Sequence, residues 1–235
     1  MEGGLGDQWS EIVEVALDSL IPVYDKMNSV MSFGKDLFWR ERGIRKALNG
    51  SEKLLDAGCG PGVMTEVATT IFPSLKPVML DALGSMLGHA SIRTLGKNSG
   101  LVRGVFERLP FKDKQFDAVM MGFSFRDAQN MRQALFEISR VLKENGKLLI
   151  VDISKPDSSF ARTLIGFYWH FLVPMAAYFV ANKYWRHYKV LYTTYKKLPR
   201  NFELKRMILE FFDELETETK MMGGLIILVA KKTSN

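Results

Sequence analysis

The stretch KLLDAGCGPG, residues 53–62, decides the fold of this chain. A short apolar run ends at Asp56 and leads into glycines at positions 58, 60 and 62, after which a helical pattern begins. Glycine lets the backbone turn tightly and approach a ligand, and the N-terminus of the following helix offers free N–H groups. The spacing D-x-G-x-G-x-G is neither a phosphate loop, which needs Gly-Lys-Ser/Thr, nor the G-x-G-x-x-G of a dinucleotide fold. It predicts a ligand at the carboxyl end of a parallel strand.

A second acidic residue, Asp81, ends the next apolar run (residues 77–82), 19 residues after Gly62. A carboxylate in this position accepts hydrogen bonds from both hydroxyls of a ribose. The competing interpretation is that Asp81 caps a helix N-terminus. Together with the glycine turn, Asp81 favours a ligand that contains a nucleoside.

Strand-like and helical patterns alternate through most of the chain. Strands are predicted at residues 53–57, 77–82, 101–106, 116–122, 146–153 and 224–232, and helices at 63–72, 84–97 and 129–143. This alternation indicates an α/β fold with a parallel sheet. Residues 1–50 precede the first strand and residues 157–206 interrupt the alternation, so both segments are candidates for a helical cap over the sheet.

Composition limits the class of protein. The 235 residues suffice for one α/β domain or two very small ones, and 47% hydrophobic with 25% charged residues is ordinary globular usage. Cys59 is the one cysteine, which rules out an internal disulfide and indicates a reducing, cytoplasmic setting. The N-terminus does not have the pattern of a signal peptide, and no side-chain cluster has metal-ligand spacing.

An apolar stretch runs directly into a basic one. Residues 163–182 are uncharged, and residues 183–206 carry eight basic residues against the single acidic Glu203, which more than accounts for the net charge of +6. The apolar part is long enough for a transmembrane helix, although His170 and Pro174 make it a poor one. It could equally be a lid over an apolar pocket, a helix lying on a membrane surface, or a buried core helix. The local basic patch favours one anionic surface over general nucleic-acid binding.

Several motifs together resemble a known enzyme family. The glycine turn, Asp81, LPFKDKQFDAV (109–119) and the strand GKLLIV (146–151) are similar to class I S-adenosylmethionine-dependent methyltransferases. More specifically, YDKMNSVMSFGKDLFWR (24–40), FSFRD (123–127), ALFEISRVLKENGKLLIVDISKP (134–156) and the ending GGLIILVAKK resemble the ubiquinone/menaquinone biosynthesis C-methyltransferase family. These motifs span most of the chain.

The resemblance implies a Rossmann-like fold with a seven-stranded, mostly parallel sheet, an antiparallel last strand and a helical cap. It implies one domain over residues 1–235, made of an N-terminal helical cap (1–50), a cofactor-binding core (51–156), an apolar and basic helical insertion (157–206) and a final helix and strands (207–235). It implies S-adenosyl-L-methionine as cofactor. The expected cofactor-binding residues are Tyr24, Asp56, Gly58, Gly60, Gly62, Asp81, Ala82, Met86, Phe106, Glu107 and Phe123.

Three side chains are candidates for catalysis. Methyl transfer to a ring carbon requires a ring hydroxyl to lose its proton, so the site needs a group that stabilises a phenolate or accepts the proton. Arg126 follows the fourth predicted strand and stays protonated, which suits the first role, and Asp127 is either a base or the ion-pair partner of Arg126. His170 in the apolar stretch is a candidate proton acceptor, or a hydrogen-bonded core residue.

The leading hypothesis is therefore C-methylation of the reduced ring of a polyprenylated quinone precursor. The alternatives are a methyltransferase for another lipophilic small molecule, a nucleic-acid methyltransferase and a non-enzymatic lipid-binding protein. The methyltransferase for another lipophilic small molecule is motivated by residues 192–199, which match the family only loosely. The expected partners are a lipophilic quinol and a membrane surface contacted through residues 160–206, with a homodimer as an open alternative and no nucleic acid. The expected location is the cytoplasm, at the inner face of the membrane.

Overall fold

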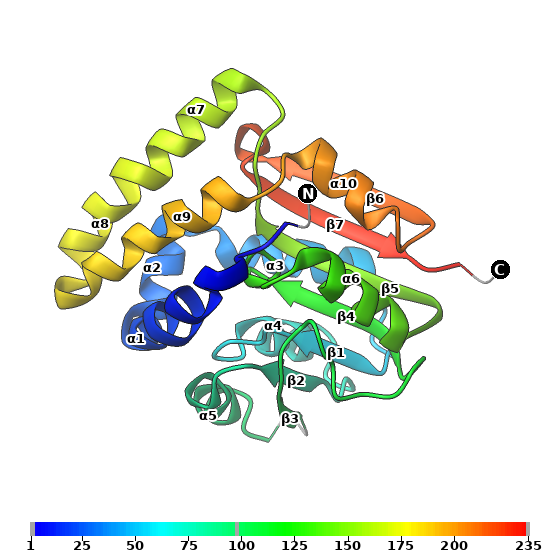
Figure 1. Ribbon diagram of the computed structural model, residues 1–235. Helices are drawn as coiled ribbons and strands as arrows, with labels where there is room; N and C mark the ends of the chain where they lie inside the picture. Colours follow the sequence, from blue (N-terminus) through cyan, green and yellow to red (C-terminus); the bar gives the residue numbers. More distant parts are fainter. Residues whose placement is uncertain (1–2, 97–98, 234–235) are drawn as a thin grey trace.

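A seven-stranded sheet forms the centre of the protein in the computed structural model, which describes residues 3–96 and 99–233 (Figure 1). The strand order is β3-β2-β1-β4-β5-β7-β6, in which β7 pairs antiparallel with both β5 and β6 and all other pairs are parallel. The strands are β1 Leu54–Ala57, β2 Val78–Asp81, β3 Gly100–Arg103, β4 Phe116–Gly122, β5 Leu142–Ile153, β6 Glu214–Lys220 and β7 Leu225–Lys231. This confirms the expected α/β fold with an antiparallel last strand.

Helices cover both faces of the sheet, as strand–helix alternation requires. On one face, α3 (Asp36–Ala47), α4 (Val63–Ile71) and α5 (Gly84–Arg93) bury their apolar residues, among them Ile44, Met64 and Leu87. On the other face, α6 (Met131–Val141) and α10 (Asn201–Ile208) bury Leu135, Ile138, Leu204 and neighbouring residues. The side chain of Asn130 caps α6 by accepting a hydrogen bond from the N–H of Gln133.

Two groups of helices lie beyond the carboxyl ends of the parallel strands (Figure 1). The N-terminal group comprises η1 Gly6–Gln8, η2 Ser10–Leu17, α1 Asp18–Leu20, η3 Ile21–Val23 and α2 Tyr24–Met31. The second group comprises α7 Ser159–Phe167, η5 Tyr168–Leu172, α8 Val173–Val180, η6 Asn182–Lys189 and α9 Val190–Lys197. The two groups are in contact, for example between α2 and α8. The expected end of the insertion at residue 206 falls inside α10, and the division of the chain into four segments of one domain stays a prediction.

The apolar stretch forms a continuous helical segment from Ser159 to Val180. Within the described residues, this is the one helix whose length and mean hydropathy (1.4) would allow it to cross a membrane. Its inner face buries Trp169, Val173 and Ala177, but large apolar side chains on its outer face are exposed. It is therefore not the buried core helix that one interpretation predicts.

Candidate active site

The glycine turn after β1 lies directly against its neighbours. The N–H groups of Gly58 and Cys59 both donate to the carbonyl oxygen of Leu80 at the end of β2. Gly58 has φ +71°, and a Cβ atom there would lie 2.6 Å from the Cβ atom of Ser124. No other residue fits this position without moving its neighbours, so glycine is required where the turn approaches Ser124, two residues after the end of β4.

The carboxylate of Asp81 closes this turn. It accepts hydrogen bonds from the N–H of Gly60 (2.8 Å) and from the N–H of Leu83 (2.9 Å), which precedes α5. Asp81 thus links the glycine turn to the residue that precedes α5, and its contact with a ribose stays a prediction. A carboxylate has about four acceptor positions, so two remain for a ligand hydroxyl pair. Burial raises the pKa of Asp81 above its usual value.

A cavity of about 620 Å³ opens beside this turn. Nine of the eleven expected cofactor residues line it: Tyr24, Gly58, Gly60, Asp81, Ala82, Met86, Phe106, Glu107 and Phe123. Arg126 and Asp127 line it as well. We call it the turn cavity. Its wall combines turn backbone, the acidic side chains of Asp81, Glu107 and Asp127, the cationic Arg126 and apolar side chains, which suits a nucleoside with a charged extension.

The other two expected cofactor residues do not line the turn cavity. Asp56 is fully buried and accepts a 2.7 Å hydrogen bond from the hydroxyl of Thr65, and burial raises the pKa of its carboxyl to about 7. Gly62, at φ +86°, starts α4, where a Cβ atom would lie 3.1 Å from Ala90. Both residues therefore support the turn without lining the turn cavity.

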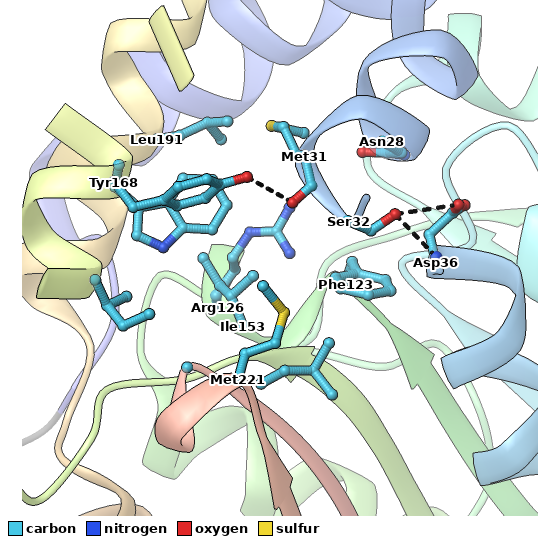
Figure 2. A pocket seen from close by; sticks show the side chains of 14 residues that line it. Asn28, Met31, Ser32, Asp36, Phe123, Arg126, Ile153, Tyr168, Leu191 and Met221 are labelled. Carbon is cyan, nitrogen blue, oxygen red and sulfur yellow. Dashed lines mark hydrogen bonds between the residues drawn. The ribbon is translucent and has the colours of Figure 1, made fainter. Parts of the chain in front are cut away.

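A second, largely apolar cavity adjoins the first (Figure 2). Its wall comprises Asn28, Met31, Ser32, Asp36, Phe123, Arg126, Ile153, Ile165, Tyr168, Trp169, Leu191, Met221, Gly224 and Leu225. We call it the apolar cavity. Phe123 and Arg126 line both cavities, so their side chains form the shared wall.

Phe123 is held in an unusual backbone conformation. Its φ is +59°, a region that bulky residues rarely occupy. The N–H of Phe123 donates to the carbonyl oxygen of Val151, and the guanidinium of buried Arg40 lies 4.7 Å from the centre of the Phe123 ring. Backbone strain of this kind concentrates at functional sites, which fits the position of Phe123 between two cavities.

Arg126 is fixed by two acidic residues. A guanidinium N–H donates to Asp152 Oδ1 (2.7 Å), and its Nε lies 3.7 Å from Asp127 Oδ1. Burial alone would lower the pKa of the Arg126 guanidinium, but the charges of Asp127 and Asp152 outweigh it, so this pKa lies above its usual range. Burial raises the pKa of Asp127 to about 7, even though the charge of Arg126 lowers it in part. Asp152 is not among the site residues expected from the sequence, although it begins the segment DISKP.

His170 lies elsewhere. Its side chain is exposed and lines neither cavity, with its ring against Phe171 and Tyr192. Neither sequence interpretation of His170, as a proton acceptor beside the pocket or as a core residue, agrees with this position. Tyr168 and Trp169, its neighbours, line the apolar cavity instead.

The fold and the glycine turn define a class I S-adenosylmethionine-dependent methyltransferase. Among solved structures, the fold is similar to a Thermotoga maritima protein described as an S-adenosylmethionine-dependent methyltransferase and possible histamine N-methyltransferase (TM-score 0.62, 17% identity, 93% of this chain and 98% of that chain). A Bacillus halodurans protein described as a putative methyltransferase is similar too (TM-score 0.61, 19% identity, 83% of this chain and 99% of that chain).

The sequence comparisons are more specific. Residues 5–230 match the ubiE/COQ5 methyltransferase family, and the chain belongs to this family. It is 30% identical to a ubiquinone/menaquinone biosynthesis C-methyltransferase of Pseudomonas paraeruginosa, over 94% of this chain and 88% of that protein. It is 34% identical to a demethylmenaquinone methyltransferase of Thermotoga maritima, in an alignment that covers 67% of this chain and 69% of that protein. The protein is thus an S-adenosylmethionine-dependent methyltransferase, and the close backbone at Gly58 with the carboxylate of Asp81 fits that cofactor.

Proposed function

We propose that this enzyme C-methylates the reduced ring of a polyprenylated quinone precursor, a demethylmenaquinol-like molecule. The observation that carries the proposal is the shared wall: the turn cavity and the apolar cavity meet at Phe123 and Arg126. A methyl donor in one and a lipophilic ring in the other would react across this wall. The names of the similar proteins from Pseudomonas paraeruginosa and Thermotoga maritima support the same substrate class.

We assign the turn cavity to S-adenosylmethionine, which supplies a methyl group already activated on a sulfonium. Asp81 would accept hydrogen bonds from the ribose hydroxyls, and Phe106, Met86 and Ala82 would enclose the adenine. The backbone must serve the adenine amino group at position 105, because this residue is valine. Tyr24 would hold the methionine end of the cofactor, because the Tyr24 hydroxyl lies beside Gly60 of the turn. A Cβ atom built on Gly60 would be 3.6 Å from this hydroxyl.

Arg126 and Asp127 supply the chemistry that the acceptor needs. A ring carbon becomes a sufficient nucleophile when the neighbouring hydroxyl loses its proton. The fixed guanidinium of Arg126 faces the apolar cavity and would stabilise the oxyanion that develops there (Figure 2). Asp127 lines the turn cavity beside Arg126 of the shared wall, and its carboxyl, with a pKa raised to about 7, suits the role of proton acceptor near neutral pH. His170 has no role in this proposal because it lies outside both cavities.

We further propose that the enzyme docks on the cytoplasmic face of an anionic membrane. Ile165 and Tyr168 line the apolar cavity from the same helical segment whose outer side is exposed. That outer side, the apolar face, consists of Phe160, Leu164, Phe167, Phe171, Met175 and Phe179, with Phe33 next to Tyr168. A prenyl tail could therefore pass from the cavity into a bilayer without crossing water.

A basic groove supports the anionic character of this membrane. It is lined by seven cations, Arg132, Lys155, Arg162, Lys196, Lys197, Arg200 and Arg206, and by two carboxylates, Glu203 and Glu210. Arg162 lies on α7, two residues from Phe160 of the apolar face. The side chains of Lys183, Arg186 and Lys189, which belong to the expected basic patch, lie outside the described residues. Basic residues near an anionic leaflet each contribute about 1 kcal/mol. A homodimer that covers the apolar face is the competing outcome.

The function is tested with purified full chain, S-adenosylmethionine and chemically reduced quinones from a strain blocked in ring methylation. Mass spectrometry should show the gain of one methyl group, and Asp81→Ala should abolish it by removing the ribose contact. Methylation of other lipophilic phenols but not of the quinol would contradict the proposed substrate while leaving the cofactor assignment intact.

A further inference from the structure

An amide without a hydrogen-bond partner lies in the wall of the apolar cavity. Among the hydroxyl, amide and carboxylate side chains that line this cavity in the described chain, three are engaged. The hydroxyl of Tyr168 donates to the carbonyl oxygen of Met31 (2.6 Å), and the hydroxyl of Ser32 accepts from the N–H of Asp36 and contacts its carboxylate. Asn28 alone makes no side-chain hydrogen bond, and its buried Nδ2 has no partner.

An unsatisfied buried amide is costly, because it has lost water without gaining a partner. Arg126 lines the same cavity, and its Nε, which makes no hydrogen bond, is ion-paired with Asp127 Oδ1 at 3.7 Å. The largely apolar wall thus carries two donor groups, the unpartnered amide of Asn28 and the guanidinium of Arg126. Figure 2 shows them on different elements, Asn28 on α2 and Arg126 after β4. Donor groups at two places in a largely apolar cavity favour a ligand with an oxygen atom at each of two positions.

The helix α2 relates Asn28 to the cofactor. Tyr24 and Asn28 are one helical turn apart, so they project from the same side of α2. Tyr24 lines the turn cavity and Asn28 lines the apolar cavity. The same helix therefore lines both cavities, the turn cavity with Tyr24 and the apolar cavity with Asn28 one turn later.

We infer that Asn28 binds the hydroxyl of the acceptor ring that does not take part in the chemistry, while Arg126 binds the hydroxyl beside the methylated carbon. This inference rests on the proposed function and deepens it. A hydroquinone carries two oxygens on opposite sides of its ring, and one amide can donate to one of them or accept its proton. Asn28 would then select dihydroxy rings over monohydroxy rings and fix the orientation of the ring.

Binding measurements on the full chain, saturated with S-adenosylhomocysteine, test this inference. Two ligands are compared by calorimetry: reduced 2-prenyl-1,4-naphthalenediol, and 3-prenyl-1-naphthol, which keeps the hydroxyl beside the accepting carbon and lacks the other. Wild type should bind the diol about tenfold more tightly, the size of one well-made hydrogen bond. Asn28→Leu should weaken the diol about tenfold and leave the naphthol unchanged, so that the preference disappears.

Two variants keep the result interpretable. Ser29→Leu, at the exposed neighbouring position of α2, should retain the full preference. If Asn28→Leu binds neither ligand, Asn28→Ala removes the amide without adding bulk and supplies the ratio. A tenfold preference that survives in these Asn28 variants would overturn the inference. If wild type methylates no quinol at all, the proposed function is wrong and the inference falls with it, whereas quinol methylation with an unchanged preference overturns the inference alone.

Discussion

The carboxylate of Asp152 holds Arg126 at two points. Its Oδ1 accepts from the Arg126 guanidinium at 2.7 Å, and its Oδ2 accepts from the Arg126 backbone N–H at 3.0 Å. Asp152 also accepts from the N–H of Ile153, so the carboxylate itself is fixed by β5. A guanidinium positioned in this way before substrate arrives stabilises charge without reorganising.

Replacing Arg126 should therefore impair the chemical step much more than cofactor binding. For Arg126→Lys we expect kcat to fall by about 100-fold or more, the range observed when one oxyanion donor is removed. Lysine keeps the charge but cannot make both the Asp152 contact and the contact to the substrate oxygen. Steady-state kinetics and calorimetric titration with S-adenosylhomocysteine measure the two effects separately. Equal losses in both would contradict a role at the substrate oxygen.

Asp152→Asn tests whether Asp152 acts through Arg126. We expect a smaller fall in kcat, about tenfold, with little change in cofactor affinity, because the guanidinium loses a charge-assisted hydrogen bond but remains in the cavity. The double variant Asp152→Asn/Arg126→Lys should be no slower than Arg126→Lys alone. Fully multiplied losses would show that the two residues act independently.

The activity should depend on the ionisation of Asp127. Its pKa is raised to about 7, and a proton acceptor must be deprotonated, so kcat should rise with pH, reach half its maximum near pH 7 and level off about one pH unit higher. Asp127→Asn should remove this inflection as well as lower the rate. A rate profile that is flat from pH 6 to 8 in wild type would exclude Asp127 as the base.

Stability should show the effect of buried Asp56. The pKa of Asp56 is raised in the folded chain to about 7, so the folded state binds a proton that the unfolded state releases above pH 4. Its contribution to stability is thus fully present below pH 4 and is lost as pH rises through 7. Asp56→Asn retains an acceptor for Thr65 and should raise the melting temperature at pH 8, with the gain shrinking toward pH 4.5. A gain of the same size at both pH values would contradict this assignment.

The close approach at Gly58 predicts a sharp response to one methyl group. Gly58→Ala places a Cβ atom 2.6 Å from Ser124 in a left-handed backbone conformation, and we expect a loss of about 1–3 kcal/mol in stability with weakened cofactor binding. Gly88→Ala is the matched control, because nothing lies within 4 Å of its Cβ position in α5 and alanine favours helix. Thermal melts with and without S-adenosylhomocysteine measure both variants.

Membrane docking predicts a difference between two exposed phenylalanines. Phe171→Asp on the apolar face should abolish sedimentation with phosphatidylglycerol vesicles, whereas Phe136→Asp on α6 should leave it unchanged, although both side chains are about half exposed. Lys196→Gln in the basic groove should weaken vesicle binding by about fivefold, the equivalent of 1 kcal/mol per charge. A wild-type protein that forms dimers and ignores vesicles would assign the apolar face to a second copy instead.

Much of the site could be predicted because it depends on local sequence. The turn at Gly58 and the acid at Asp81 follow strands, and parallel strands bring their carboxyl ends together in any sheet of this order. Strand β6 could not be located, because its sequence ELETETK is polar and half-exposed at the sheet edge. Its place is set by pairing with β7 and not by an apolar pattern.

His170 illustrates what local sequence does not determine. Which side of an apolar helix faces the core depends on helical phase, and η5 is a π-helical segment that changes this phase at Tyr168–Leu172. Trp169 therefore turns inward and His170 outward. Asn28 and Asp152 were also missed, because their importance lies in contacts with segments far away in the sequence.

The central claim is that a methyl group passes to a ring carbon across the wall formed by Phe123 and Arg126. The most direct measurement supplies S-adenosylmethionine with a carbon-13 methyl group to the wild-type enzyme and a reduced, prenylated 1,4-naphthalenediol, and locates the label in the product by nuclear magnetic resonance. We expect a methyl signal bonded to the ring carbon next to a hydroxyl, absent in Arg126→Lys at equal reaction time. A methoxy signal, or label transfer that does not depend on Arg126, would contradict it.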